Sequence, residues 1–445
     1  MTTIYAAHWV LPISNSPIEN GAVAVEGTHI VAVGNRNIVT QEYPSATIQD
    51  FGHAAIIPGL INAHTHLELT AMRGYLEDEE SDFFAWLRKL TVARLERMTP
   101  DDIRVSATWG ACEAARAGIT SVGDASDSAL MSMLALKDVG LRGIVFQESF
   151  GPDPSLATDN FKSLKTKVAQ LREVANELVR VGVSPHAPYT VCGPQLELIA
   201  DYSLTEKLPL MMHAAESAAE ESLLREGCGL FADGLAKRNI EWVAPRVSTI
   251  QYLKQRGILE TQTLLAHCIR VDEQDVETLV ESKATVAHCP KSNAKLGHGR
   301  APFARFLERR LDVGLGSDSV ASNNTCDILE EARFAALIAR SEAMVSATEV
   351  LATATMGGSR CLGLAGEIGQ LTKGSHADLA IVSLAGTHQQ PSYDPTASLI
   401  FSSSGRDVVM TVVAGREVFR EGRVVNVDEE RLRARLAEIA DKLKV

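Results

Sequence analysis

Short apolar runs that end in a polar residue recur through the middle of the chain. Each ends in histidine or aspartate where a loop is expected, and the runs are Val181–His186, Leu208–His213, Thr263–His267 and Leu311–Asp318. Segments with helical periodicity lie between such runs, for example at 160–181 and 272–281. Apolar runs of this length indicate buried parallel strands, and their alternation with helices indicates repeated β-α units. The pattern predicts an α/β protein with a (β/α)8 barrel over residues 59–365.

The sequence pattern at the two ends of the chain differs from that in the middle. Short β-like runs between glycines occur at 22–25 and 29–33, and similar runs return at 378–382 and 408–413. Such runs are typical of strands joined by turns. We predict that residues 1–58 and 366–445 together form a second, small β domain, although two separate appendages would give the same pattern. A closing helix is predicted at about 428–444 from four apolar residues at helical spacing, which are Leu432, Leu436, Ile439 and Leu443.

Composition and charge limit the classes of protein to which this chain can belong. The chain has 445 residues, of which 45% are hydrophobic, and one large and one small domain fit this length. The formal charge of -13 argues against nucleic acid as a partner, because nucleic-acid binding needs a basic face. Seven cysteines without paired spacing are typical of reduced thiols. No export signal or long apolar stretch is evident, so we expect a cytoplasmic protein without a membrane anchor.

His64 and His66 follow the apolar run at 54–62. Side chains two residues apart on an extended strand point the same way, so the two imidazoles can hold one metal ion together. The carboxyl ends of barrel strands meet at one edge, which brings His213 and Asp318 toward this pair. We predict that His64, His66, His213 and Asp318 form the shell of one divalent ion. Such an ion lowers the pKa of bound water to about 7 and makes hydrolysis feasible at neutral pH.

Six ordered motifs give the chain a clear family resemblance. They are Pro58–His66, Ser184–Thr190, His213–Glu216, Leu265–His267, Ala287–Asn293 and Gly316–Asp318. In this order they resemble the amidohydrolase superfamily, in its branch of mononuclear deaminases and triazine chlorohydrolases. The resemblance covers nearly the whole chain. It implies that the four predicted ligands surround Zn²⁺, or in some members Fe²⁺, that Glu216 shuttles protons and that His267 orients the attacking water.

The residue types support these roles. Glu216 can protonate a ring nitrogen and later the leaving amine, and Asp318 can bind the metal or accept the proton of the water. His186 and His288 lie where this branch places groups that contact the substrate, and Ser292 and Asn293 follow His288 as a further part of the pocket wall.

The remaining histidines lack such a context, and we expect them to be structural or exposed: His8, His29, His53, His298, His376 and His388.

The stretch after the first motif bears on the substrate. Glu68–Gly74 and Asp82–Leu87 resemble segments of deaminases that act on S-adenosylhomocysteine, methylthioadenosine or aminodeoxyfutalosine. Glu68 could accept hydrogen bonds from ribose hydroxyls, and Phe83, Phe84 or Trp86 could cover the pocket. Arg73 could meet a substrate carboxylate or form a structural salt bridge.

The leading hypothesis is hydrolytic deamination of a 5′-substituted adenine nucleoside. Binuclear amide hydrolases of the superfamily use a lysine at the end of the fourth strand, where this chain has His186. Two alternatives stay open. A guanine or triazine aminohydrolase or chlorohydrolase would use the same shell on a smaller substrate, and a scaffold would bind without catalysis. The resemblance also implies a homodimer, with a small molecule as the substrate.

Overall fold

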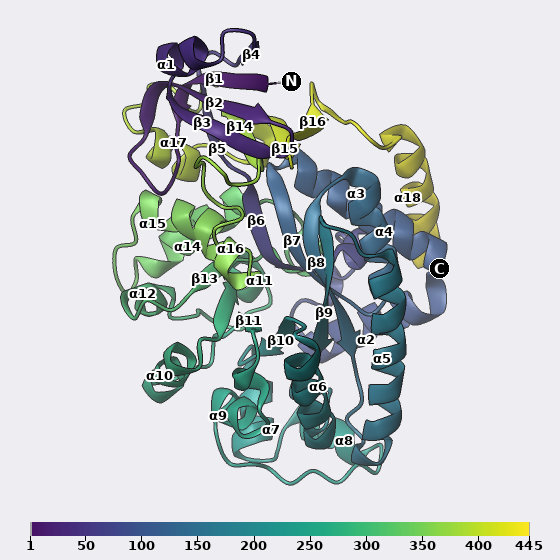
Figure 1. Ribbon diagram of the computed structural model, residues 1–445. Helices are drawn as coiled ribbons and strands as arrows, with labels where there is room; N and C mark the ends of the chain where they lie inside the picture. The colour runs from purple at the N-terminus through teal and green to yellow at the C-terminus, as the bar shows by residue number, and fades with distance from the viewer. Residues whose placement is uncertain (1, 445) are drawn as a thin grey trace.

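The computed structural model describes residues 2–444 and contains two β-sheets, each with its own helices (Figure 1). The larger unit is a barrel of eight strands in sequential order. An isolated parallel bridge between Thr65 and Asp318 joins the first strand to the last, which nearly closes the barrel. The predicted (β/α)8 fold is confirmed. Its strands are β6 (Leu60–Thr65), β7 (Ile119–Ser126), β8 (Arg142–Ser149), β9 (Val179–Pro185), β10 (Leu210–Ala214), β11 (Thr263–His267), β12 (Thr285–His288) and β13 (Val313–Leu315).

Helices connect successive strands, and their ends follow local sequence signals. Thr99 and Asp102 form a capping box at the start of α3, with Pro100 as its first residue. The helices of this unit are α3 (Pro100–Arg116), α4 (Ala129–Val139), α5 (Ala157–Val174), α6 (Gly193–Glu206), α7 (Ala218–Arg225), α8 (Leu230–Ala236), α9 (Thr249–Gln255), α10 (Glu273–Ser282), α11 (Pro290–Lys295), α12 (Phe303–Glu308), α13 (Val320–Asn323), α14 (Ile328–Ala339), α15 (Ala347–Ala352) and α16 (Gly358–Cys361).

One predicted helix is shorter than its sequence pattern. The helical periodicity of 160–181 extends past the end of α5 at Val174. The side chain of Asn176 accepts hydrogen bonds from the backbone of Leu178 and Val179, at 3.0 and 2.8 Å. This local turn competes with the helix and leads the chain into β9.

The smaller unit is a mixed sheet built from both ends of the chain, as predicted. Strand β14 pairs antiparallel with β5, so the C-terminal strands continue the N-terminal sheet. Its strands are β1 (Thr2–Val10), β2 (Ile18–Glu26), β3 (His29–Asn35), β4 (Thr47–Asp50), β5 (Ala54–Pro58), β14 (Leu379–Ser383), β15 (Val408–Val413), β16 (Arg416–Arg420) and β17 (Arg423–Val424). The short helix α1 (Arg36–Glu42) packs on this sheet, whereas α17 (Pro395–Phe401), between β14 and β15 in the chain, packs against α14 and α15 of the barrel.

The closing helix α18 (Glu429–Lys444) forms where the sequence predicts it. It packs against α3 of the barrel (Figure 1), not against the small sheet with which we grouped it. Lys442 lies 2.8 Å from the buried carboxylate of Asp102 in α3. Ile439 and Leu443 join an apolar cluster that contains Trp86. The helix therefore supports the segment that follows β6, which also lines the cavity described below.

Buried contacts join the two units and close the barrel beneath its polar end. Arg142 of β8 donates from Nε to Asp378, 2.7 Å away, and both side chains are almost fully buried.

Inside the barrel, an apolar layer includes Ile61, Phe146 and Met211. This layer fills the interior of the barrel below the carboxyl ends of the strands. The polar groups at those ends therefore lie directly above close-packed apolar side chains that exclude water.

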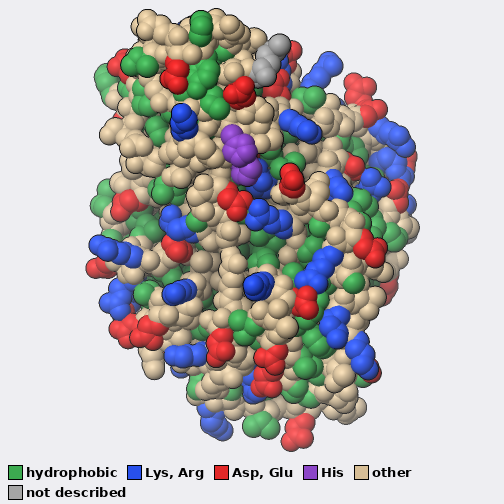
Figure 2. All heavy atoms as spheres, in the orientation of Figure 1, with side chains coloured by type: hydrophobic (Ala, Val, Ile, Leu, Met, Phe, Trp, Pro, Cys, Tyr) green, Lys and Arg blue, Asp and Glu red, His purple; other side chains and the backbone are tan. Residues whose placement is uncertain are grey.

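Three features of the described residues bear on the predictions from composition: the distribution of charge, the lengths of the helices and the state of the cysteines. On the face shown in Figure 2, basic and acidic side chains are mixed. Within residues 2–444, no helix has the length and apolar composition needed to cross a bilayer. The seven cysteines are all free thiols, in agreement with their unpaired spacing.

Candidate active site

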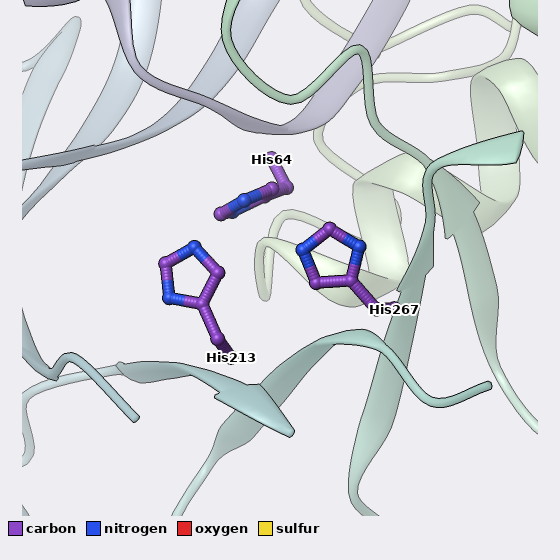
Figure 3. A group of neighbouring side chains, drawn as sticks. All are labelled: His64, His213 and His267. Atoms are coloured by element: carbon purple, nitrogen blue, oxygen red, sulfur yellow. The ribbon is translucent and has the colours of Figure 1, made fainter. Parts of the chain in front are cut away.

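Six histidines and an aspartate lie at or just after the carboxyl ends of barrel strands. The rings of His64, His213 and His267 point toward one another (Figure 3). Two backbones at this edge are in the left-handed region, with φ of 75° at His267 and 53° at Asp318. Aspartate tolerates this conformation, but a bulky residue such as His267 adopts it only under strain, and such strain is concentrated at functional sites. The barrel thus holds these side chains in fixed orientations at one point.

The nitrogen atoms of three histidines are arranged for a cation. Nδ1 of His213 lies 2.9 Å from the carbonyl oxygen of His186. A carbonyl only accepts hydrogen bonds, so Nδ1 carries the proton and Nε2 is bare. This bare nitrogen lies 3.1 Å from Nε2 of His66. Nε2 of His64 is buried without a hydrogen-bond partner among the described residues. Oδ1 of Asp318 lies 3.6 Å from Nε2 of both His64 and His66.

The electrostatics of this cluster fit metal ligands. Burial lowers the pKa of His64 to about 4 and also lowers the pKa of His66 and His213. Burial alone would raise the pKa of Asp318, but the polar contact with His64 and the charge of His267 hold it well below its usual range. Neutral imidazoles and an ionised carboxylate are the forms that bind a divalent ion. The four predicted ligands therefore converge and suit such an ion.

A second layer of hydrogen bonds fixes Asp318. Its Oδ2 accepts from the hydroxyls of Ser292 and Ser322, at 2.6 and 2.7 Å. Its Oδ1 accepts from the backbone N–H of Ser319, 2.7 Å away. We expected Ser292 to contact the substrate, but the structure directs its hydroxyl to Asp318. Partners of this kind orient a ligand and tune its basicity.

Glu216 and His267 face each other next to the candidate ligands. Nε2 of His267 lies 3.7 Å from Oε1 of Glu216. Nδ1 of His267 lies 2.8 Å from Oδ1 of Asn293, so Asn293 orients His267 from behind, although we expected it in the pocket wall. Burial lowers the pKa of His267, but the charges of Glu216 and Asp318 outweigh this effect and raise it.

Glu220 holds the backbone of the proton-shuttle segment. Its carboxylate accepts from the backbone N–H groups of Ala215 and Glu216, at 2.8 and 3.0 Å, and from the hydroxyl of Thr249. Burial raises the pKa of Glu220 to about 7. Glu220 is thus a positioning residue for Glu216, which the sequence motif alone did not indicate.

His298 belongs to the site, and the expectation that it is structural or exposed is wrong. Its Nε2 lies 3.7 Å from Oε1 of Glu216, and its side chain is 8% exposed. The ring meets Phe83 edge-on, with centroids 4.6 Å apart. Gly297 and Gly299, both with positive φ, turn the chain back toward the barrel. This glycine pair was the signal available in the sequence, because glycines on both sides of a residue allow a tight turn.

A cavity of about 910 Å³ opens beside the candidate metal ligands His66, His213 and Asp318. Its roof is α2 (Phe83–Val92), continued by the π-helical segment η3 (Ala93–Arg97), together with α8. Phe231 of α8 stacks on Tyr189, with ring centroids 4.0 Å apart, and touches Phe84 of α2 at 4.6 Å. Phe83, Phe84 and Trp86 line the cavity, so these three aromatics are placed as the sequence led us to expect.

Glu68 lines the cavity but is already occupied by protein donors. Its Oε1 accepts from Arg94 and from the backbone of Asp127, at 3.0 and 3.3 Å. Its Oε2 accepts from Ser126 and from the backbone of Ser128, at 2.7 and 3.0 Å. A carboxylate offers about four lone-pair sites, and each of these donors uses one. The structure therefore leaves Glu68 little capacity for the sugar hydroxyls that we expected it to bind.

His186 and His288 differ in their access to the cavity. His186 lines it, next to the phenyl ring of Phe150, with centroids 4.7 Å apart. His288 is buried and stacks on Phe303, with centroids 5.0 Å apart. In the described part of the chain, His288 is not among the residues that line the cavity. Of these two predicted substrate contacts, the structure brings only His186 to the pocket.

Arg73 forms the structural salt bridge that was one of its two expected roles. It pairs with Glu113, and its side chain is 38% exposed. Within residues 2–444 it does not line the cavity. We predict that Arg73→Ala leaves kcat and KM within about twofold of wild type and lowers the free energy of unfolding by about 1 kcal/mol or less. Steady-state kinetics and urea unfolding measure both, and a tenfold rise in KM would instead place Arg73 on the substrate.

Comparisons with known proteins agree with this geometry. 5-Methylthioadenosine/S-adenosylhomocysteine deaminase of Pelotomaculum thermopropionicum is 31% identical over 424 residues, which is 93% of this chain and 92% of that protein. An adenosine deaminase of Xanthomonas campestris with bound zinc superimposes with a TM-score of 0.87 at 26% identity, over 99% of this chain and 98% of that one. Helicobacter pylori aminofutalosine deaminase, at 22% identity and a TM-score of 0.79 over 94% of this chain and all of that one, shares the fold.

The family assignment rests on the length of the match as well as on the site. The model of the amidohydrolase family matches residues 55–418. This range begins in β5 and ends in β16, so it contains the whole barrel and every residue of the candidate metal centre. The chain belongs to the amidohydrolase family.

Proposed function

We propose that this hydrolase removes the exocyclic amine of a 5′-substituted adenine nucleoside and releases ammonia. One observation carries the proposal. Four candidate metal ligands and the Glu216–His267 pair lie beside a large, mostly apolar cavity that is roofed by α2 and α8. The pair has the groups that amine displacement needs, and the cavity has room for more than a bare heterocycle.

His64, His66, His213 and Asp318 would hold the metal, and Zn²⁺ suits three imidazoles and a carboxylate. When bound, a zinc ion supplies the Lewis acid that makes water nucleophilic at neutral pH. The zinc in the Xanthomonas campestris structure supports this choice. The bare Nε2 of His213, 3.1 Å from Nε2 of His66, supports it independently.

Proton transfers are assigned to the side chains beside the ligands. Asp318, held ionised by its neighbours, accepts the proton of the attacking water. Glu216 gives a proton to the ring nitrogen next to the reacting carbon; the carboxylate that is left then takes the proton of the new hydroxyl on that carbon and passes it to the departing amine. The proton held by Asp318 returns to Glu216 at the end of the cycle, so both side chains regain their starting states. His267 is fixed by Asn293, and its Nε2 hydrogen-bonds the attacking water so that the water approaches the carbon from one direction.

The shape of the cavity supports a substituted nucleoside. Beyond the metal ligands, its wall is formed largely by apolar side chains of the two roof helices, such as Phe84, Leu87, Leu90, Leu230 and Phe231. An apolar 5′ group such as a thioether would be buried there. The name of the Pelotomaculum thermopropionicum relative, which covers almost the whole chain, points to the same substrate class.

A substrate panel tests the proposal. Ammonia release is measured with zinc-loaded protein on methylthioadenosine, S-adenosylhomocysteine, aminodeoxyfutalosine, adenosine, guanine and a chlorotriazine. We expect the highest kcat/KM on a 5′-substituted adenosine, at least about tenfold above adenosine, because the apolar roof binds the 5′ group. Turnover confined to guanine, or chloride release from the triazine, would contradict the proposal.

We also propose that the protein is a homodimer and that it is located in the cytoplasm. Both features follow from the family resemblance and from the composition of the chain. The chain has a mass of 48.0 kDa, so we expect light scattering to give twice that value. A mass equal to one chain would contradict the dimer.

A further inference from the structure

Glu148 is a buried acid for which the structure provides no partner. It lies near the end of β8, its residue is 4% exposed, and it lines the cavity. Oε1 is buried and has no hydrogen-bond partner among residues 2–444. A buried polar group without a partner is rare and costs stability, so it requires an explanation. A position in the wall of a binding cavity suggests that the partner is a ligand.

The neighbouring acids of this wall are all satisfied by the protein. Glu68 accepts from four donors, as described above. Asp127 contacts Arg94 at 3.1 Å and Lys167 at 2.9 Å. The two cations thus offset the charges of Glu68 and Asp127 and leave Glu148 out of the network. Burial, together with the nearby charge of Glu68, raises the pKa of Glu148 well above its usual range.

A second metal ion does not explain Glu148. One ligand atom each of Glu148, His186 and His213 lies within 4.8 Å of the others. However, Nδ1 of His213 is bound to the carbonyl of His186, and its Nε2 faces His66. His213 therefore has no nitrogen left for a second ion. Glu148 and His186 alone are two ligands, whereas metal sites use three or more from the protein.

Glu148 and His186 together form a small polar patch in a largely apolar wall. One ring nitrogen of His186 is engaged by the hydroxyl of Thr190, 2.9 Å away, and the other is available. The patch thus offers one carboxyl group and one imidazole nitrogen next to the ring of Phe150. Neighbouring hydroxyl groups match this patch, because each hydroxyl both donates and accepts.

We propose that Glu148 and His186 bind the two adjacent hydroxyls of the substrate's sugar and thereby select an intact ribose. This inference rests on the proposed function, because it assumes that the substrate is a nucleoside. It moves the sugar site from Glu68, whose carboxylate is occupied, to the one acid of this wall that lacks a partner in the described part of the chain. Glu148 is then a specificity-determining residue, not a structural one.

The first test measures stability without substrate. An unpaired buried carboxyl destabilises the free protein, so Glu148→Met, which keeps the length of the side chain, is expected to raise Tm by about 1–3 °C. A structural role for Glu148 predicts the reverse, and a fall in Tm by more than about 3 °C would overturn the inference. Glu331→Gln is the matched control, because Glu331 is equally buried but accepts hydrogen bonds from Lys291 and Asn323.

The second test measures discrimination between sugars. The kcat/KM for methylthioadenosine is divided by that for its 2′,3′-dideoxy analogue. We expect a ratio of about 100 for the wild type and below about 5 for Glu148→Met, because the variant loses activity mainly on the ribonucleoside. Glu148→Gln, whose amide also donates and accepts, should restore part of the ratio. Glu331→Gln should leave the ratio unchanged.

The outcomes separate the two proposals. If the wild type deaminates methylthioadenosine and Glu148→Met keeps the wild-type ratio, the sugar site is overturned and the proposed function stands. If the wild type deaminates none of the nucleosides, the proposed function is overturned and the sugar site falls with it. A collapse of the ratio in Glu148→Met, with metal content equal to wild type, supports both.

Discussion

Replacing Glu216 with glutamine is expected to lower kcat for deamination by about 10²- to 10⁴-fold, the usual contribution of a general acid–base group. Glutamine keeps the shape of the side chain but cannot carry a proton between the ring nitrogen and the leaving amine. The carboxyl of Glu216 lies 3.7 Å from both His267 and His298, so the substitution leaves these neighbours in place. Ammonia release under saturating substrate measures the effect.

Controls for Glu216→Gln separate chemistry from folding. Its metal content, measured by mass spectrometry of the digested protein, should equal that of the wild type, because Glu216 is not one of the four candidate ligands. Glu221→Gln is the matched control, since Glu221 lies on the adjacent helix and pairs with Arg270 at the surface. It should keep kcat within about twofold. A Glu216→Gln enzyme with a kcat within tenfold of wild type would contradict the assigned role.

Replacing Asp318 with asparagine is expected to abolish measurable turnover and to weaken metal binding. The side chain has two roles in the account, as a ligand facing His64 and His66 and as the acceptor of the water proton, and the amide serves neither well. The loss should exceed about 10⁴-fold in kcat/KM, because the metal and the base are impaired together. The loss is measured as kcat/KM of the variant and of the wild type, each loaded with one zinc ion per chain.

Ser292→Ala gives a graded counterpart to Asp318→Asn. It removes only the hydroxyl that donates to Oδ2 of Asp318, at 2.6 Å. Outer hydrogen-bond partners of metal ligands typically change metal affinity or activity by about 10- to 100-fold, and we expect a loss in that range. An Asp318→Asn enzyme no more impaired than Ser292→Ala would show that Asp318 is only a structural residue.

The sequence could predict the barrel and the convergence of the candidate metal ligands, because both depend on short-range patterns. His64 and His66 share a face through the strand period of 2, and His213 and Asp318 follow apolar runs that form β10 and β13. Once parallel strands close into a barrel, their carboxyl ends must meet. The convergence of ligands about 250 residues apart in the chain therefore needs no knowledge of loops or side-chain rotamers.

The rest of the site depends on directions that a sequence pattern does not carry. Ser292 and Asn293 lie on α11, and their side chains point back to Asp318 and His267 instead of into the cavity. The π-helical turn after α2 carries Arg94 inward to Glu68, which determines what Glu68 can bind. The apolar face of α18 was visible in the sequence, but its partner α3 was not, because an apolar stripe specifies burial and not the surface that buries it.

The most direct test of the account is a zinc titration of metal-free protein, with ammonia release from methylthioadenosine as the readout. The four ligands at the strand ends predict that activity rises linearly and reaches its plateau at one zinc ion per chain. The occupied His213 predicts no further gain from a second ion. Full activity in the metal-free protein, or a plateau reached only at two ions per chain, would contradict the single-metal deaminase described here.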